Sequence, residues 1–227
     1  MRRVISDIIN SGGDYEVAAI ARDGVEGFDL IVSNPHLYSA VILDINMPKM
    51  NGLELLEKLQ KNRIEQTVIV VSTVAKEGAK ETIKALELGA FDFVTKPENY
   101  LETKGETFKN NIHKMLDLAT GSHRSKVDLR TTSFAKPGSV VRPAKPKPVV
   151  MPRKLEPGNF TGVKTGRKKI VALACSTGGP KSLQQVIPYL PKNLDAPVVL
   201  VQHMPAGFTF SLSQRLNEIS EVEVKEA

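Results

Sequence analysis

The stretch ACSTGGP, residues 174–180, begins at the last residue of an apolar run, residues 170–174. A continuously apolar run is typical of a parallel strand that is buried on both faces. The Gly-Gly-Pro at residues 178–180 predicts a tight turn into a helix, whose first backbone N–H groups favour negative charge. This strand–turn–helix pattern indicates an α/β fold and resembles a serine elbow, with Ser176 at the strand end, the place where a nucleophile is expected.

A second apolar run, residues 198–201, ends in Gln202 and His203. If residues 181–190 form the crossover helix of a right-handed βαβ unit, the two strands are parallel neighbours. Ser176 and His203 then emerge at the same edge of the sheet. His203 could act there as a base toward Ser176. The alternative is that Ser176 only caps the helix and that His203 is an ordinary residue at a strand end.

Three apolar runs in the first half of the chain also end in polar groups. They end in Asp44, in Ser72 and in a Thr-Lys-Pro segment that contains Lys96. On parallel strands these groups meet at one sheet edge, where an ammonium and a hydroxyl could stabilise a phosphorylated carboxylate. Each residue alone has an ordinary alternative, as a solvated acid in a turn, a serine at a strand end or a lysine before proline.

The order of elements in this half predicts a flavodoxin-like fold. Strands are expected at residues 16–21, 41–44, 68–72 and 91–95, with helices between them. This is a (βα)₅ pattern without its first strand, which in the order 2-1-3-4-5 would lie between the second and third strands. The second half begins another, doubly wound parallel α/β domain.

Charge separates the two halves. The predicted domains are residues 1–120 and 169–227, with a linker at 121–168. Residues 122–169 carry 13 Lys or Arg and 2 Asp or Glu, so the rest of the chain has a net charge of −5 within a total of +6. Six prolines and few aromatics predict a flexible linker. A tether to nucleic acid or an acidic surface is the alternative, but only two phenylalanines are interleaved with the cations, so nucleic acid is not an expected partner.

The remaining composition favours a cytoplasmic protein. The single cysteine excludes an internal disulfide, and no apolar run approaches the ~20 residues that a membrane-spanning helix needs. Four histidines without spaced cysteine or carboxylate partners predict no zinc site. Membrane insertion is therefore not expected.

Read together, the segments LACSTGGP, LVQHMPAGFT and SLSQRLNEIS and the receiver-type INMPKMNG after Asp44 resemble the chemotaxis response-regulator methylesterases. The resemblance implies a receiver domain that regulates a hydrolase. In that family the hydrolase removes methyl esters from receptor glutamates and also deamidates receptor glutamines. The family usually has Gly-Ala before the serine, whereas this chain has Ala174 and Cys175, both of them small.

The resemblance also implies roles for residues of the hydrolase segment. Ser176 corresponds to the nucleophile, His203 to the general base and Thr177 to a supporting member of the oxyanion region. No residue in 217–227 matches the segment that contains the family's orienting aspartate. No cofactor is expected for the esterase reaction.

In the receiver, the resemblance implies that Asp44 accepts the phosphoryl group and binds Mg²⁺ together with an acidic pair that this sequence lacks. Ser72 and Lys96 would contact the phosphoryl group, and Phe93 would be the switch aromatic. The implied partners are methyl-accepting chemoreceptors as substrate and the chemotaxis histidine kinase as phosphodonor.

Two expectations concern the chain as a whole. The resemblance predicts a chain truncated at both ends, beginning inside the first receiver helix and ending in an early strand of the hydrolase domain. The alternative function is a non-catalytic signalling protein or transcription regulator that carries a receiver and a binding domain.

Overall fold

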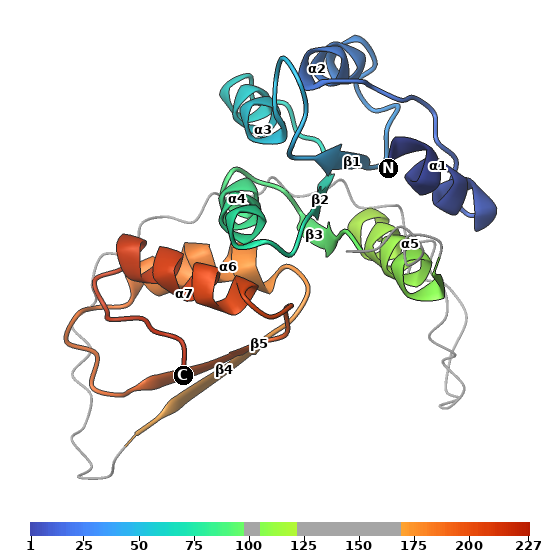
Figure 1. The fold of residues 1–227 in the computed structure, drawn as a ribbon. Coiled ribbons are helices and arrows are strands. Elements are labelled where there is room, and N and C mark those ends of the chain that lie inside the picture. The colour runs from blue at the N-terminus through green and yellow to red at the C-terminus, as the bar shows by residue number, and fades with distance from the viewer. Residues whose placement is uncertain (98–104, 122–168) are drawn as a thin grey trace, which may run out of the picture.

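Helices and strands alternate along the chain, as the sequence predicts (Figure 1). The structure is a computed structural model that describes residues 1–97, 105–121 and 169–227. The first half contains α1 (Arg2–Ser11), α2 (Gly24–Ser33), β1 (Val41–Asp44), α3 (Gly52–Lys61), β2 (Val68–Ser72), α4 (Lys76–Glu87), β3 (Asp92–Thr95) and α5 (Glu106–Thr120). The second half contains β4 (Val171–Cys175), α6 (Gly179–Val186), the 3₁₀ helix η3 (Ile187–Tyr189), β5 (Val198–Gln202) and α7 (Phe208–Ile219). Apart from Gly121, the predicted basic linker lies outside the described residues.

Strands β1, β2 and β3 form a parallel sheet in that order. Asp44 lies opposite Val71, and Ser72 lies opposite Thr95. All five residues of the central strand, β2, are buried. The order corresponds to the third, fourth and fifth strands of the flavodoxin-like fold, and it brings the carboxyl ends of the three strands to one edge.

Helices cover both faces of this sheet. On one face α1 and α5 pack around Ile69 and Val94, and on the other α2, α3 and α4 pack around Val68 and Val70. Consecutive residues of β2 point to opposite faces because side chains alternate along a strand. The receiver half is therefore the doubly wound α/β layer structure that its sequence predicts.

The strand predicted for residues 16–21 does not form. A strand exists only where its backbone pairs with a neighbour, and no strand of the described residues pairs with this segment. Side chains provide partners instead. The Val17 N–H donates to Asn10 Oδ1 at 2.9 Å, and the Arg2 guanidinium donates to the Ala21 carbonyl at 3.1 Å.

Strands β4 and β5 pair in parallel, with Cys175 opposite Gln202. The crossover between them begins at Gly179, two residues earlier than predicted, and ends in η3 instead of continuing to residue 190 as one helix. Pro188 lies in η3, and a proline lacks the N–H that would continue an α-helix. The predicted βαβ unit is present.

The prediction that these two strands are buried on both faces is wrong for the described residues. Helices α6 and α7 lie on one face of the two-stranded sheet (Figure 1). The described residues supply no helix to the other face, where the apolar side chains of Val199 and Val201 are 49% and 63% exposed.

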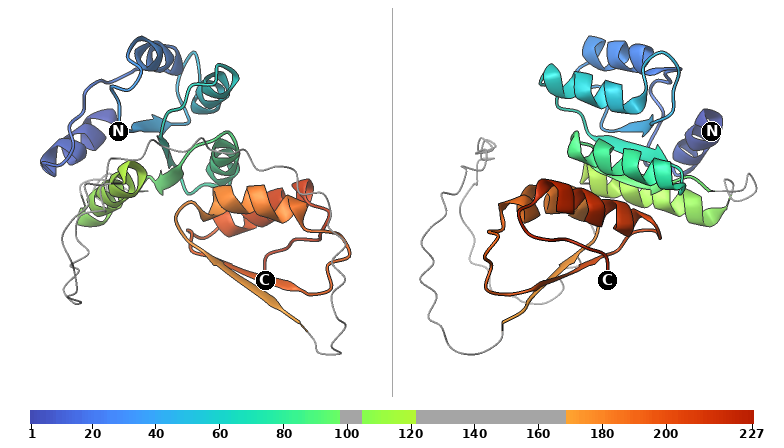
Figure 2. Two further views of the ribbon diagram at one scale, coloured as in Figure 1. Left: turned by 180° about the vertical axis from the view of Figure 1, so that it is seen from behind. Right: turned by 60° about the vertical axis from the view of Figure 1, so that its left-hand side comes forward.

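The two halves meet where α6 and α7 pack against α4 of the receiver (Figure 2). Leu183 of α6 and Leu212 and Leu216 of α7 belong to the same buried cluster as Ile83 and Leu86 of α4. The receiver and the second half therefore share a continuous apolar core.

Candidate active site and phospho-acceptor site

The carboxylate at the end of β1 has a cation beside it. Lys96 Nζ lies 2.6 Å from Asp44 Oδ2, and the Asn46 N–H donates to Asp44 Oδ1 at 3.2 Å. Lys96 reaches this position because its backbone N–H continues the β2–β3 ladder and donates to the Ser72 carbonyl at 2.6 Å. The fold thus places an ammonium next to the carboxylate, where it can offset the charge of an added phosphoryl group.

The hydroxyl of Ser72 has other partners. It is buried and donates to the carbonyls of Gly78 at 3.1 Å and Thr73 at 3.4 Å. Among the residues that the structure describes, no hydrogen bond joins it to Asp44. Ser72 lies at the predicted sheet edge, and its hydroxyl is bonded to α4 instead of Asp44.

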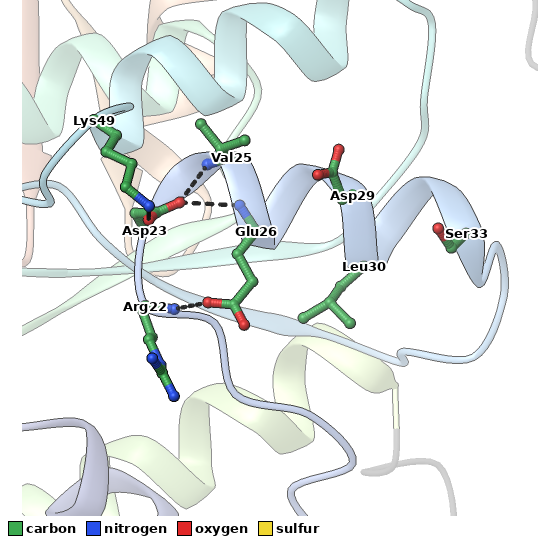
Figure 3. Close-up of a pocket in the computed structure, with 8 residues that line it drawn as sticks. All are labelled: Arg22, Asp23, Val25, Glu26, Asp29, Leu30, Ser33 and Lys49. Atoms are coloured by element: carbon green, nitrogen blue, oxygen red, sulfur yellow. Dashed lines mark hydrogen bonds and ion pairs between the residues drawn. The ribbon is translucent and has the colours of Figure 1, made fainter.

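The loop after Asp44 is anchored to the start of α2 (Figure 3). Lys49 forms an ion pair with Asp23 at 2.7 Å, and Asp23 accepts the N–H groups of Val25 and Glu26, both at 3.0 Å. The hydrogen bond and charge of Lys49 hold the pKa of Asp23 below its ordinary value. The ion pair lies in a surface pocket, which is lined by Arg22, Asp23, Val25, Glu26, Asp29, Leu30, Ser33 and Lys49.

The described residues near Asp44 do not fit a Mg²⁺ site. Mg²⁺ prefers several oxygen ligands in octahedral geometry. Nowhere in residues 1–97, 105–121 and 169–227 do three or more His, Cys, Asp or Glu side chains form a group that could hold a metal ion. The acidic pair that would accompany Asp44 is also not found in the sequence.

Ser176 and His203 are the first residues after two paired parallel strands. The register Cys175 opposite Gln202 puts both at the same edge, and the His203 N–H extends the ladder by donating to the Cys175 carbonyl at 3.3 Å. Ser176, His203 and the neighbouring Thr177 are exposed. In the described structure no hydrogen bond yet links the Ser176 hydroxyl to the His203 ring.

The turn after Ser176 leads directly into α6. Gly178 has φ of 72°, a left-handed conformation that glycine adopts without strain, and the Gly179 N–H donates to the Ser176 carbonyl at 2.8 Å. Ser176 therefore stands at the N-terminus of α6, where free N–H groups and the helix dipole favour negative charge. A nucleophilic serine, a histidine and an anion-stabilising helix end are the components of acyl transfer.

Two family models match this chain. Residues 1–104 match the model described as response regulator receiver domain, and residues 171–227 match the model described as CheB methylesterase. Together the two matches cover well over half of the chain. In this order of domains the chain is similar to the CheB methylesterases. The resemblance inferred from the sequence motifs is thereby confirmed.

Curated relatives agree with this membership. The chain is 39% identical to a protein-glutamate methylesterase/protein-glutamine glutaminase of Pyrococcus abyssi, in an alignment that covers 100% of this chain and 56% of the relative. It is 41% identical to the protein of the same name from Thermotoga maritima, of which it covers 58%. The crystal structure of the response regulator domain of Thermotoga maritima CheB is 36% identical, with a TM-score of 0.44 over 53% of this chain and 86% of that one. The chain thus spans less than two thirds of the length of the two curated relatives.

A carboxylate of the receiver half reaches the helix that follows Ser176. Asp92 Oδ2 accepts the Gly178 N–H at 2.8 Å, and Asp92 Oδ1 accepts the Phe93 N–H at 2.9 Å. Burial raises the pKa of Asp92 above its ordinary value, and the two N–H groups oppose only part of that rise. The N-terminal end of α6 is therefore already occupied by an acidic group of the receiver.

Replacing Asp92 with alanine is expected to weaken the docking of the two halves. The Gly178 N–H would lose its acceptor in a partly buried position, which costs about 1–3 kcal/mol. Amide hydrogen exchange followed by NMR checks this, because the Gly178 amide should exchange faster in the variant. An unchanged rate would show that the hydrogen bond contributes nothing to docking.

The predicted switch aromatic, Phe93, lies in the same contact. Its ring stacks on the ring of Phe208 at the start of α7, with centroids 4.8 Å apart and an interplanar angle of 12°. Lys181 of α6 adds a hydrogen bond from Nζ to the Gly89 carbonyl at 3.0 Å. The receiver thus contacts both helices that follow the proposed catalytic strands.

A charged pair lies at the C-terminal end of α4. Arg215 donates to Glu87 at 2.8 Å and to Glu218 of its own helix at 3.0 Å, and the side chains of Arg215 and Glu87 are each 30% exposed. Burial raises the pKa of Glu87, but hydrogen bonds and charges from Arg215 and Lys84 outweigh it, and the pKa lies below the ordinary value of 4.5.

This pair predicts a pH dependence of docking. A carboxyl whose pKa is lowered in the docked state stabilises that state above pH 4.5, and the contribution is lost as the pH falls through the lowered pKa. Replacing Arg215 with alanine should weaken docking by about 1 kcal/mol at neutral pH and remove this part of the acid sensitivity. Small-angle X-ray scattering between pH 3 and 7 measures the separation of the two halves in the wild type and in Arg215→Ala. Equal acid responses in the two proteins would contradict the prediction.

Sequence reasoning did not find Asp92, Phe208 or Arg215. Each of them contacts the other half, and a single sequence does not say which surfaces meet. The one available signal was Asp92 itself, an acid between two phenylalanines in a buried strand, since a carboxylate in such a place needs a partner.

Proposed function

We propose that this chain is part of a phosphorylation-regulated hydrolase that demethylates glutamate methyl esters of chemoreceptors and deamidates receptor glutamines. One observation carries the proposal. Ser176 and His203 leave adjacent parallel strands at the same edge, with Ser176 at the N-terminus of α6. The names of the curated relatives support it, since they are protein-glutamate methylesterases/protein-glutamine glutaminases.

In the proposed reaction, Ser176 Oγ attacks the carbonyl carbon of the glutamyl methyl ester and its proton passes to His203. The negative charge that develops on the carbonyl oxygen is stabilised near Thr177 and the N-terminal end of α6. The C–O bond to the methoxy group breaks, and methanol leaves with the proton from His203. Water, activated by the same histidine, then hydrolyses the acyl-enzyme. A glutamine side chain would follow the same path with ammonia as the leaving group.

The receiver is proposed to restrain this reaction until Asp44 is phosphorylated. The contacts of Asp92 with Gly178 and of Phe93 with Phe208 hold the receiver beside the reacting edge. A phosphoryl group on Asp44 would attract Lys96 and the Ser72 hydroxyl, and the movement of β2 and β3 would repack Phe93. The result is a shift in the population of docked and undocked forms rather than a change of fold.

The proposed setting follows from the same account. A histidine kinase supplies the phosphoryl group, the methylated chemoreceptors are the substrate, and the protein acts in the cytoplasm. The proposed division is a receiver at residues 1–120, a basic linker at 121–168 and a methylesterase segment at 169–227. No helix in the described part of the chain is long and apolar enough to cross a membrane.

Methanol release tests the proposed activity. Chemoreceptors carrying radiolabelled methyl esters are incubated with the chain, and volatile label is counted. Label above the buffer control, increased by a phosphodonor, is the expected result. No release, together with salt-sensitive binding to DNA, would instead support the receiver-bearing regulator.

A further inference from the structure

Gln202 lies between the two proposed catalytic residues. It is the last residue of β5, immediately before His203, and it is opposite Cys175, the residue immediately before Ser176. Its side chain is partly buried at the reacting edge, and its Oε1 atom is fully buried.

The amide group of Gln202 joins the backbones of both catalytic residues. Its Nε2 donates to the Ser176 carbonyl at 3.0 Å and to the His203 carbonyl at 3.1 Å. An amide NH₂ has two protons, so the two acceptors use its whole donor capacity. A flipped amide would direct Oε1 at two carbonyl oxygens, which repel it, and so the hydrogen bonds fix the orientation of the group.

The start of α6 leaves room for this side chain. A Cβ atom at position 179 would overlap Gln202 Oε1 and would lie 2.7 Å from Cys175 Cβ. Gly179 therefore permits the approach of the glutamine to the turn after Ser176. Within the described residues Gln202 Oε1 has no hydrogen-bond partner, although burying such an oxygen costs free energy. The hydrogen bonds of this amide thus come from its two donors and not from its carbonyl.

We propose that Gln202 is a positioning residue that holds the Ser176 turn and His203 in register for proton transfer. The inference rests on the proposed function. The Ser176 carbonyl is held from the α6 side by the Gly179 N–H at 2.8 Å and from the β5 side by Gln202 at 3.0 Å. Without the second bond, only the strand ladder relates the serine turn to the histidine. A displacement of about 1 Å between reacting groups is enough to slow a reaction on the order of 10²-fold.

The variants Gln202→Glu and Gln202→Met test this. Both keep the length of the side chain, and both remove the amide donors. Ser176 is acylated with the activated ester 4-nitrophenyl acetate, which releases 4-nitrophenol, and the rate is measured between pH 5 and 8 in the complete chain. Both variants should be slowed on the order of 10²-fold at neutral pH. The deficit of Gln202→Glu relative to wild type should shrink toward pH 5, because a protonated glutamate regains one O–H donor. The deficit of Gln202→Met should stay constant.

Gln184→Glu is the matched control. Gln184 lies on α6 and donates from Nε2 to the Pro180 carbonyl at 3.3 Å, and its buried Oε1 has no partner in the part of the chain that the structure describes. This variant should leave the acylation rate within about twofold of wild type. Carbonyl ¹³C shifts of Ser176 and His203 are recorded in parallel, because they report the two hydrogen bonds even without any acylation.

The outcomes are distinct. Slowed acylation, pH-dependent recovery only in Gln202→Glu and shifts at both carbonyls support the positioning role. Unchanged acylation, or equal losses in Gln202→Glu and the Gln184 control, would overturn it. A wild-type chain that is not acylated at Ser176 would overturn the proposed function, and the inference that rests on it, whatever the carbonyl shifts show.

Discussion

Replacing Phe208 with alanine is expected to lower the free energy of unfolding of this chain by about 3–5 kcal/mol. The Phe208 side chain is completely buried and stacks on Phe93 of the receiver. Its loss removes apolar burial and leaves a cavity between the two halves. Since small domains are stable by only about 5–15 kcal/mol, the change should be visible as a large decrease in the urea midpoint.

A double-mutant cycle on Phe93 and Phe208 measures the interaction between the two rings separately from the overall loss of stability. Phe93→Ala, Phe208→Ala and the double variant should give a coupling energy of about 0.5–1.5 kcal/mol, the usual contribution of a stacked aromatic pair. Phe210→Ala is the control, because Phe210 lies on the same helix but is 40% exposed. Its effect should be below about 1 kcal/mol. Equal losses for Phe208→Ala and Phe210→Ala would contradict the docked arrangement.

Replacing Ser176 with alanine is expected to abolish methanol release from methylated chemoreceptors. Removal of a serine nucleophile from a hydrolase of this type lowers the rate on the order of 10⁶-fold. The fold should be unaffected, because Ser176 is exposed and only its backbone carbonyl accepts hydrogen bonds from Gly179 and Gln202. The melting temperature should therefore equal that of the wild type.

Ser213→Ala provides the comparison for this variant. The Ser213 hydroxyl donates only to the Phe210 carbonyl within α7, at 2.9 Å. Release of methanol should continue in Ser213→Ala at the wild-type rate. Persistent release in Ser176→Ala would assign the activity to another residue or to a contaminating enzyme.

Much of this architecture could be predicted from the sequence because the signals are local. Apolar runs that end in Asp44, Ser72, Ser176 or His203 mark parallel strands, and each run lies in a strand or ends at one in the structure. The juxtaposition of Asp44 with Lys96 follows from the rule that parallel strands end at one edge. The catalytic and phospho-acceptor roles of these residues stay predictions.

The features that were missed depend on contacts between distant segments. Residues 16–21 have the pattern of a strand, but pattern alone does not provide the neighbour with which a strand must pair. The docking of α4 on α6 and α7 depends on which apolar surfaces meet, and Asp92, Phe208 and Arg215 acquire their roles only there. The sequence shows Gln202 only as the residue before the histidine. In the structure its amide donates to the carbonyl of the adjacent His203 and to that of Ser176, which lies 26 residues away in the sequence.

Fluorophosphonate labelling, mapped by mass spectrometry, tests the central claim most directly. The central claim is that Ser176 is the nucleophile and that the docked receiver restrains it. We expect one adduct, on the peptide that contains Ser176, with faster labelling in Phe208→Ala than in the wild type. An adduct that persists in Ser176→Ala, or no adduct even in the undocked variant, would contradict the account.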